Sequence, residues 1–262
     1  MLVRYYLTPL YWRFHAASFL RERNYEQAVD AFDRSLKRSP RGARLWFGKG
    51  ATLHRLGRLT ESIAPLTKAL ELDEGQPRIL LELAQVYREL RRYDDALGLV
   101  DRASSCGEFR ERALFARCAI KIEAQRFQQA ESDCSLALDS CGETVGARIY
   151  SLRGVARLML GRLDDAQADF ETSYLLDPQS MDTRSYCAAV WYRRRLYDKT
   201  IMLCNSILDR EPHNALALYF RGLAERALGH DAAAEKDLNR VKELKEQGST
   251  STMLSNYSRG RF

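Results

Sequence analysis

Long apolar runs are missing from this sequence of 262 residues. A helix needs about 18 consecutive apolar residues to cross a bilayer, and no segment approaches that length. The first residues, MLVRYYLT, run into Pro9 and lack the apolar core and the small-residue cleavage site of a secretory signal. We therefore expect no transmembrane segment, and a cytoplasmic protein whose six cysteines stay thiols in a reducing compartment.

Motifs that carry catalysis or bind a metal are also missing. The cysteines form no C-x-x-C pair, and the sequence contains no Gly-rich phosphate loop and no G-x-S-x-G turn. Cysteine is small and often buried, so packing explains its presence better than chemistry does. We expect no enzyme activity, no cofactor and no metal site. The histidines, which show no metal-ligand spacing, are His15, His54, His213 and His230.

Helix breakers are few, and most of them fall at expected turns. The chain has six prolines and fifteen glycines, which leave the segments between the turns largely clear. The segment from Ala147 to Pro178 shows the arrangement. Apolar residues recur there at helical spacing on both sides of a turn that contains Gly161, and Asp177 and Pro178 end the second part. The segment predicts two amphipathic helices joined by a tight turn.

Small residues recur along the whole chain at a step of 34 residues, with a single step of 36. Helices whose axes approach to about 8–10 Å need small side chains where they cross, so the recurrence has a steric reason. In the first helix of each predicted pair the small residues are Ala16, Gly50, Ala84, Cys118, Gly154, Ala188 and Gly222. In the second helix they are Ala28, Ser62, Ala96, Ala130, Ala166, Thr200 and Ala234.

Together with the Gly turn, a following Phe and a closing Pro, these positions resemble the tetratricopeptide repeat, which has a period of about 34 residues. The resemblance implies an all-α solenoid, a right-handed superhelix of seven antiparallel helix pairs that acts as a protein-interaction scaffold or assembly adaptor. Residues 9–247 form the predicted solenoid, between a lead-in at 1–8 and a disordered tail at 248–262. Its repeats are expected to start near 9, 43, 77, 111, 147, 181 and 215.

The resemblance also implies a concave groove that is lined by the first helix of each repeat, at its second, fifth, ninth and twelfth positions. Four successive repeats have arginine at the second position, and bulky apolar residues stand at the fifth. These side chains predict a partner segment, extended or helical, that is acidic and contains apolar residues. The predicted binding residues are Arg44, Phe47, Arg78, Leu81, Arg88, Arg112, Phe115, Arg148 and Tyr192.

A solvated arginine face is the competing interpretation of this ladder. Arg78 has Glu74 and Glu82 four residues away, which allows local pairing, whereas Arg44 and Arg148 have no acidic residue three or four positions away. Repeats should stack at roughly 10 Å and salt screens charges over about 8 Å, so the ladder is tolerable without a ligand. The sequence leaves both interpretations open.

Two rival functions remain. A co-chaperone of this family would clamp the C-terminal carboxylate of its partner with lysine, arginine and asparagine side chains. At the same positions this chain has neither asparagine, and the last charge is reversed. The residues at these positions are Arg13, Ala17, Gly48, Arg78 and Glu82.

A nucleic-acid or membrane-surface adaptor would use the basic N-terminal end, since residues 1–58 carry a charge of +8 in a chain of +6. We expect no nucleic-acid partner: such binding would want basic and aromatic residues interleaved along one surface, whereas the Arg91-Arg92 and Arg193–195 turns are expected to line an edge and not a groove. No feature of the sequence sets the oligomeric state.

Overall fold

The computed structural model describes residues 9–105, 107–139 and 143–247. Within these ranges it contains fourteen α-helices, one 3-10 turn and no strand, so the predicted all-α fold is confirmed. The chain divides into two compact units, Met1–Ile120 and Lys121–Phe262. The predicted lead-in and tail lie outside the described residues.

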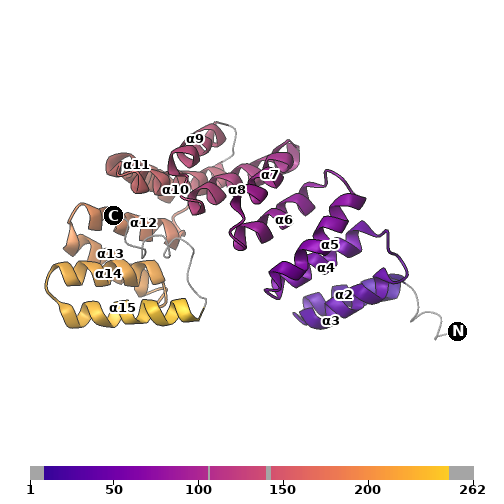
Figure 1. The fold of residues 1–262 in the computed structure, drawn as a ribbon. Coiled ribbons are helices and arrows are strands. Elements are labelled where there is room, and N and C mark those ends of the chain that lie inside the picture. The colour runs from indigo at the N-terminus through magenta and orange to yellow at the C-terminus, as the bar shows by residue number, and fades with distance from the viewer. Residues whose placement is uncertain (1–8, 106, 140–142, 248–262) are drawn as a thin grey trace. The chain divides into compact units, whose positions relative to one another are not determined.

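The first unit is built from helices that pack in antiparallel pairs, and Figure 1 shows α4 lying beside α5. A short 3-10 turn, Gly107–Phe109, precedes its last helix, and the boundary between the units falls inside that helix. The helices are α2 (Pro9–Arg21), α3 (Tyr25–Leu36), α4 (Ala43–Arg55), α5 (Leu59–Leu72), α6 (Pro77–Glu89), α7 (Tyr93–Ser104) and α8 (Arg110–Glu123).

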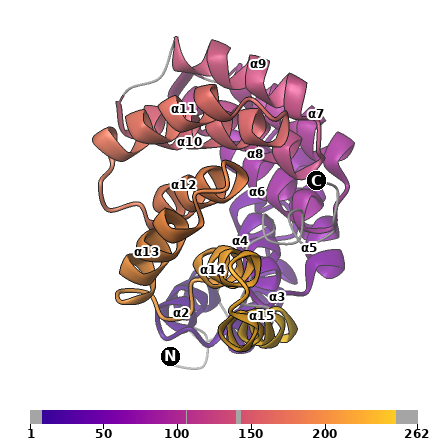
Figure 2. The same cartoon turned by 90° about the vertical axis from the view of Figure 1, so that its left-hand side faces the viewer.

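The second unit has the same construction, and Figure 2 shows α14 lying beside α15. One helix differs from expectation: α10 starts at Glu143, ahead of Ala147, so that Gly146 lies within its first turn. The helices are α9 (Phe127–Leu138), α10 (Glu143–Met159), α11 (Leu163–Leu176), α12 (Met181–Arg193), α13 (Tyr197–Leu208), α14 (Ala215–Ala227) and α15 (Asp231–Glu246).

All fourteen small residues of the two recurring positions are buried. Where the first helix of a pair has glycine, a large side chain of the second helix lies against it. A Cβ atom added at Gly154 would stand 2.7 Å from the Phe170 ring, and one added at Gly50 would stand 2.6 Å from Leu66. These distances are shorter than any van der Waals contact. The glycines are therefore required by the close approach of the two helices.

Side-chain sizes are also complementary where the first helix lacks glycine. In the pair α12–α13 the residue that corresponds to Phe170 is Cys204, and the first helix has Ala188 in place of glycine. Both residues are fully buried. Cysteine thus fills the smaller space that remains when the facing residue has a side chain, as expected for packing.

The turn inside each pair needs one residue with positive φ. Glycine supplies it at Gly57, Gly161 and Gly229, where φ lies between 75° and 83°. Elsewhere the same place in the repeat is held by residues with a side chain, which adopt φ near 60° at a cost of about 1 kcal/mol each. These residues are Arg23, Arg91, Gln125 and Arg195.

Ion pairs between helices are a second recurring contact, which the sequence pattern did not reveal. A basic residue near the middle of the first helix meets an acidic residue sixteen positions away on a second helix. Arg153 binds Asp169 at 2.7 Å, Arg221 binds Asp237 at 2.6 Å, and Lys49 binds Asp33 at 2.6 Å. Asp169 also accepts a hydrogen bond from Arg157 at 2.8 Å. Because Asp169 is only 3% exposed, this network holds α10 and α11 together within the protein interior.

The last helix, α15, has a charged face where the corresponding helices are apolar. In α5 the residues Leu59, Ile63 and Leu70 lie on the face that packs toward α6. At the equivalent positions α15 has Asp231, Glu235 and Lys242, all exposed. This replacement gives α15 a face that water solvates well.

The crossing at Gly154 supplies a stability test. Changing Gly154→Leu forces a branched side chain into the space of the Phe170 ring, and we expect a loss of about 1–3 kcal/mol of unfolding free energy. Gly98→Leu is the matched control, because Gly98 is also helical and a Cβ atom there meets nothing within 4 Å. We expect Gly98→Leu to be neutral or to stabilise by up to about 1 kcal/mol. Thermal unfolding followed by circular dichroism measures both, and equal melting temperatures for the two variants would contradict the packing described here.

Candidate functional site

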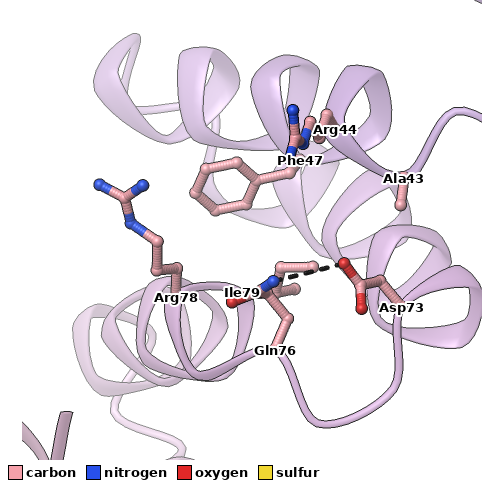
Figure 3. A pocket seen from close by; sticks show the side chains of 7 residues that line it. All are labelled: Ala43, Arg44, Phe47, Asp73, Gln76, Arg78 and Ile79. Carbon is pink, nitrogen blue, oxygen red and sulfur yellow. Dashed lines mark hydrogen bonds between the residues drawn. The ribbon is translucent and has the colours of Figure 1, made fainter. Parts of the chain in front are cut away.

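A cleft of about 530 Å³ lies between the N-terminal ends of α4 and α6 in the first unit. We call it the α4–α6 cleft. Figure 3 shows the Phe47 ring and the Arg78 side chain extending into the space between the two helices. Three of the predicted binding residues, Arg44, Phe47 and Arg78, therefore lie at one opening. The residues that line it are Ala43, Arg44, Phe47, Asp73, Gln76, Arg78 and Ile79.

Arg44 and Arg78 are exposed, and within the described residues no hydrogen bond or ion pair engages either guanidinium. The local partner that the sequence offered to Arg78 is taken elsewhere: Glu82 binds the Nδ1 atom of His54 on α4 at 2.9 Å. Two cations thus flank a half-buried aromatic ring with no acidic partner bound to them. Such a surface favours a ligand that carries both negative charge and apolar bulk.

Both helices that form the cleft begin there. The N-cap residues are Gly42 for α4 and Gln76 for α6, and in the described structure neither helix receives a hydrogen bond from a capping side chain. The first turns contain no acidic residue. The unpaired backbone N–H groups and the positive ends of two helix dipoles therefore add to the charge of the arginines.

The loop before α4 extends the basic surface. Lys37, Arg38 and Arg41 are exposed there, and the loop is held to the helix by Trp46, whose Nε1 donates to the Pro40 carbonyl oxygen at 2.8 Å. The loop before α6 carries the opposing charges, Asp73 and Glu74. Cations outnumber carboxylates around the cleft, so the local field attracts anions.

The remaining predicted residues of the first unit lie further along its helices. On α6, Leu81 packs beside the buried cluster that contains Leu80, and Arg88 is half-buried. On α8, Arg112 is exposed, with its guanidinium carbon 5.9 Å from the centre of the Phe109 ring. Phe115 is half-buried on the same helix. These side chains do not line the cleft itself.

In the second unit some positions of the first helices are buried and others are open. Val155, Leu158 and Ala189, which stand at the ninth or twelfth position of their repeats, are fully buried. Tyr192 is half-buried and its ring centre lies 5.8 Å from that of Tyr197, within an aromatic cluster. Arg148 is exposed on α10. For Arg148 and Tyr192 a role in binding stays a prediction.

The arginines that precede the second helices have a structural role, because they form ion pairs within their own repeat. The residue before each second helix is often arginine, and it binds the acidic residue three positions later. Arg58 meets Glu61 at 2.6 Å, and Arg92 meets Asp95 at 2.8 Å. The hydrogen bond to Glu61 raises the pKa of Arg58. Arginines of this kind are engaged, unlike those of the α4–α6 cleft.

A metal-binding cluster is not found among the described residues. Over residues 9–105, 107–139 and 143–247, no group of three His, Cys, Asp or Glu side chains is arranged to hold an ion. In those same ranges no helix is both long enough and apolar enough to cross a membrane. The four cysteines among them, Cys118, Cys134, Cys187 and Cys204, form no disulfide. Cys106 and Cys141 lie outside the described residues.

Comparison with known proteins agrees with the repeat pattern. Two models of the tetratricopeptide repeat family match the chain, over residues 15–77 and residues 53–114. A tetratricopeptide repeat protein from Parabacteroides merdae has a similar solved structure, with a TM-score of 0.78 and 17% identity, over 90% of this chain and 92% of that one. This likeness concerns the fold.

Curated relatives share more sequence identity with the chain, but over only a small part of their own length. The chain is 27% identical over 197 residues to RNA polymerase II-associated protein 3 of Rattus norvegicus, covering 73% of this chain and 28% of the relative. The Mus musculus protein of that name is 26% identical over 113 residues, covering 43% and 17%. The chain thus spans less than a third of the length of these relatives.

The buried thiols provide a test of the packing interpretation of cysteine. Burial raises the pKa of Cys187 to about 11 and that of Cys204 to about 12. At pH 8 only about one Cys187 in a thousand is then a thiolate, the form that alkylating reagents attack. We expect iodoacetamide to modify both residues far more slowly in the folded protein than in denaturant. Peptide mapping by mass spectrometry measures the rates, and equal rates in the two conditions would contradict the packing interpretation.

Proposed function

We propose that this chain, which tetratricopeptide repeat models match over residues 15–77 and 53–114, is a non-enzymatic interaction scaffold that binds an acidic, apolar segment of a partner protein in the α4–α6 cleft. The observation that carries the proposal is the pair Arg44 and Arg78, two exposed and unengaged cations on either side of the Phe47 ring.

A purely solvated role explains these arginines poorly. Each stands in the first turn of its helix, where a positive charge opposes the helix dipole and costs about 0.3–1 kcal/mol. Arginines with a structural role in this chain are paired with acidic neighbours, as Arg58 and Arg92 are. A carboxylate from a partner would remove the unfavourable field at both helix ends. It would also bind the two guanidinium groups.

The spacing of the repeats suggests how the ligand is arranged. An extended chain advances about 3.3 Å per residue, so three residues span roughly one repeat step of 10 Å. Acidic residues about every third position would meet Arg44 and Arg78 in turn, and then Arg112 on α8. Apolar residues between them would contact Phe47 and Leu81. Each charge pair contributes up to about 1 kcal/mol in such an open setting, so binding is collective and falls with salt.

The proposed wider role is that of an adaptor within a multiprotein complex, since such an adaptor has to hold a short segment of a partner. The name of the curated relatives, proteins associated with RNA polymerase II, accords with this role.

The rival function, in which the basic N-terminal end binds nucleic acid or a membrane surface, would depend on Arg4, Arg13, Arg21 and Arg23. Arg21 and Arg23 are exposed, while the side chains of Arg4 and Arg13 lie outside the described residues.

Charge reversal tests the proposed cleft. The probe is a synthetic peptide of about twelve residues that repeats Asp-Leu-Phe, with a peptide that repeats Lys-Leu-Phe as its negative counterpart. In the variant Arg44→Glu/Arg78→Glu two attractions become repulsions, and we expect affinity for the acidic peptide to fall at least about tenfold at physiological salt. Fluorescence anisotropy with labelled peptide measures the affinity.

The control is Arg55→Glu/Arg102→Glu, which changes the net charge equally. Arg55 and Arg102 are exposed residues of the first unit that do not line the cleft. We expect the control variant to bind within about twofold of the unmodified protein, since exposed charges beyond about 8 Å are screened. If both variants lost the same affinity for the acidic peptide, binding would depend on net charge and not on the cleft. Unchanged binding by Arg44→Glu/Arg78→Glu would refute the site.

A further inference from the structure

The imidazole of His54 on α4 bridges two glutamates of α6. Its Nδ1 atom lies 2.9 Å from Glu82 Oε1, and its Nε2 atom lies 3.1 Å from Glu89 Oε1. Gln85, between the two glutamates, donates to the same oxygen of Glu89 at 2.9 Å. The His54 side chain is 14% exposed, so these contacts are partly shielded from water.

Only the protonated ring can satisfy both contacts. A neutral imidazole has one N–H donor, whereas the imidazolium has two, and ionised carboxylates only accept. The hydrogen bond to Glu82 is the main cause that raises the pKa of His54 above 6.5; burial acts against it, and Glu89 adds to it. Deprotonation would leave a ring lone pair facing a carboxylate, and one of the two contacts would be lost.

The other helices packed on α4 supply no competing partner for His54. The charges that act on the ring come from Glu82 and Glu89 of α6, the helix that also carries Arg88. Charged residues of α3 and α5 form pairs of their own: Asp30 with Arg34, Asp33 with Lys49, Glu26 and Glu61 with Arg58, and Glu71 with Lys68.

The bridge joins the two helices that form the α4–α6 cleft. His54 follows Arg44 by ten residues on α4, about 15 Å along the helix axis. Glu82 follows Arg78 by four residues on α6, or about one turn. The cleft is therefore open at the N-terminal ends of two helices that are tied together further along. The tie fixes their separation and also places the Glu82 carboxylate about one helical turn from Arg78, with Glu89 further along the same helix.

We propose that His54, Glu82 and Glu89 form a pH-sensitive clasp that sets the affinity of the α4–α6 cleft for acidic ligands, an inference that rests on the proposed function. In the protonated state the imidazolium joins α4 to α6 and offsets one of the two carboxylates. In the neutral state the joint loosens and both carboxylates are uncompensated, which repels an acidic segment. Affinity for an acidic ligand is thus higher below the pKa of His54 and falls as the pH rises through it.

The first measurement concerns the clasp alone and needs no ligand. We expect NMR titration of the His54 ring to give a pKa above 6.5 in the full chain. The variant Glu82→Gln removes the main cause and should lower that pKa. A His54 that titrates at or below 6.5 in the unmodified protein would overturn the clasp.

The second measurement concerns its coupling to the cleft. We expect the affinity for the peptide that repeats Asp-Leu-Phe to weaken by about two- to fivefold between pH 6 and pH 8.5, with no such change in His54→Gln. A pH dependence that persists in His54→Gln, or one that is absent from the unmodified protein, would overturn the coupling. A peptide that binds at neither pH would overturn the proposed function and the coupling with it, and the ring titration would still decide whether the clasp exists.

Discussion

Every feature of this protein depends on the close crossing of the two helices within each repeat. At the crossing in the fifth pair, Gly154 on α10 faces Phe170 on α11 so closely that a single added carbon would overlap the ring. That contact fixes how far the first helix rotates about its own axis. The rotation decides which side chains face the neighbouring repeat and which face outward. In the second pair the equivalent contact is that of Gly50 with Leu66, and Arg44 and Phe47 of the same helix line the α4–α6 cleft.

The repeat architecture and the core of the candidate site were predictable from the sequence. A period fixes the register, and the register places residues such as Arg44 and Arg78 at equivalent positions on successive helices. Side-chain contacts between different helices were not predictable from the sequence. Glu82 looked like a local partner for Arg78, yet it binds His54 because the bridge between helices satisfies both groups. The burial of single positions such as Ala189 also depends on packing against neighbouring helices, which the periodic pattern does not specify.

Charge in this chain serves three different ends. Arg153, which is half-buried, pairs with the buried Asp169 and so holds α10 and α11 together. Exposed pairs such as Arg92 with Asp95 contribute little to stability and keep the turns in place. Arg44 and Arg78 at the cleft have no internal partner in the described structure, and we propose that they bind a ligand. The sequence pattern alone could not tell paired arginines from unpaired ones, because both kinds recur at regular spacing.

The most direct test of this account is NMR of the arginine Nε–Hε groups during titration with the acidic peptide. Each guanidinium reports its own hydrogen bonding, so the site is located without any substitution. The account predicts that the signals of Arg44 and Arg78 shift together and saturate, while those of the engaged Arg58 and Arg92 stay in place. Shifts that spread evenly over the exposed arginines, or that spare Arg44 and Arg78, would contradict it.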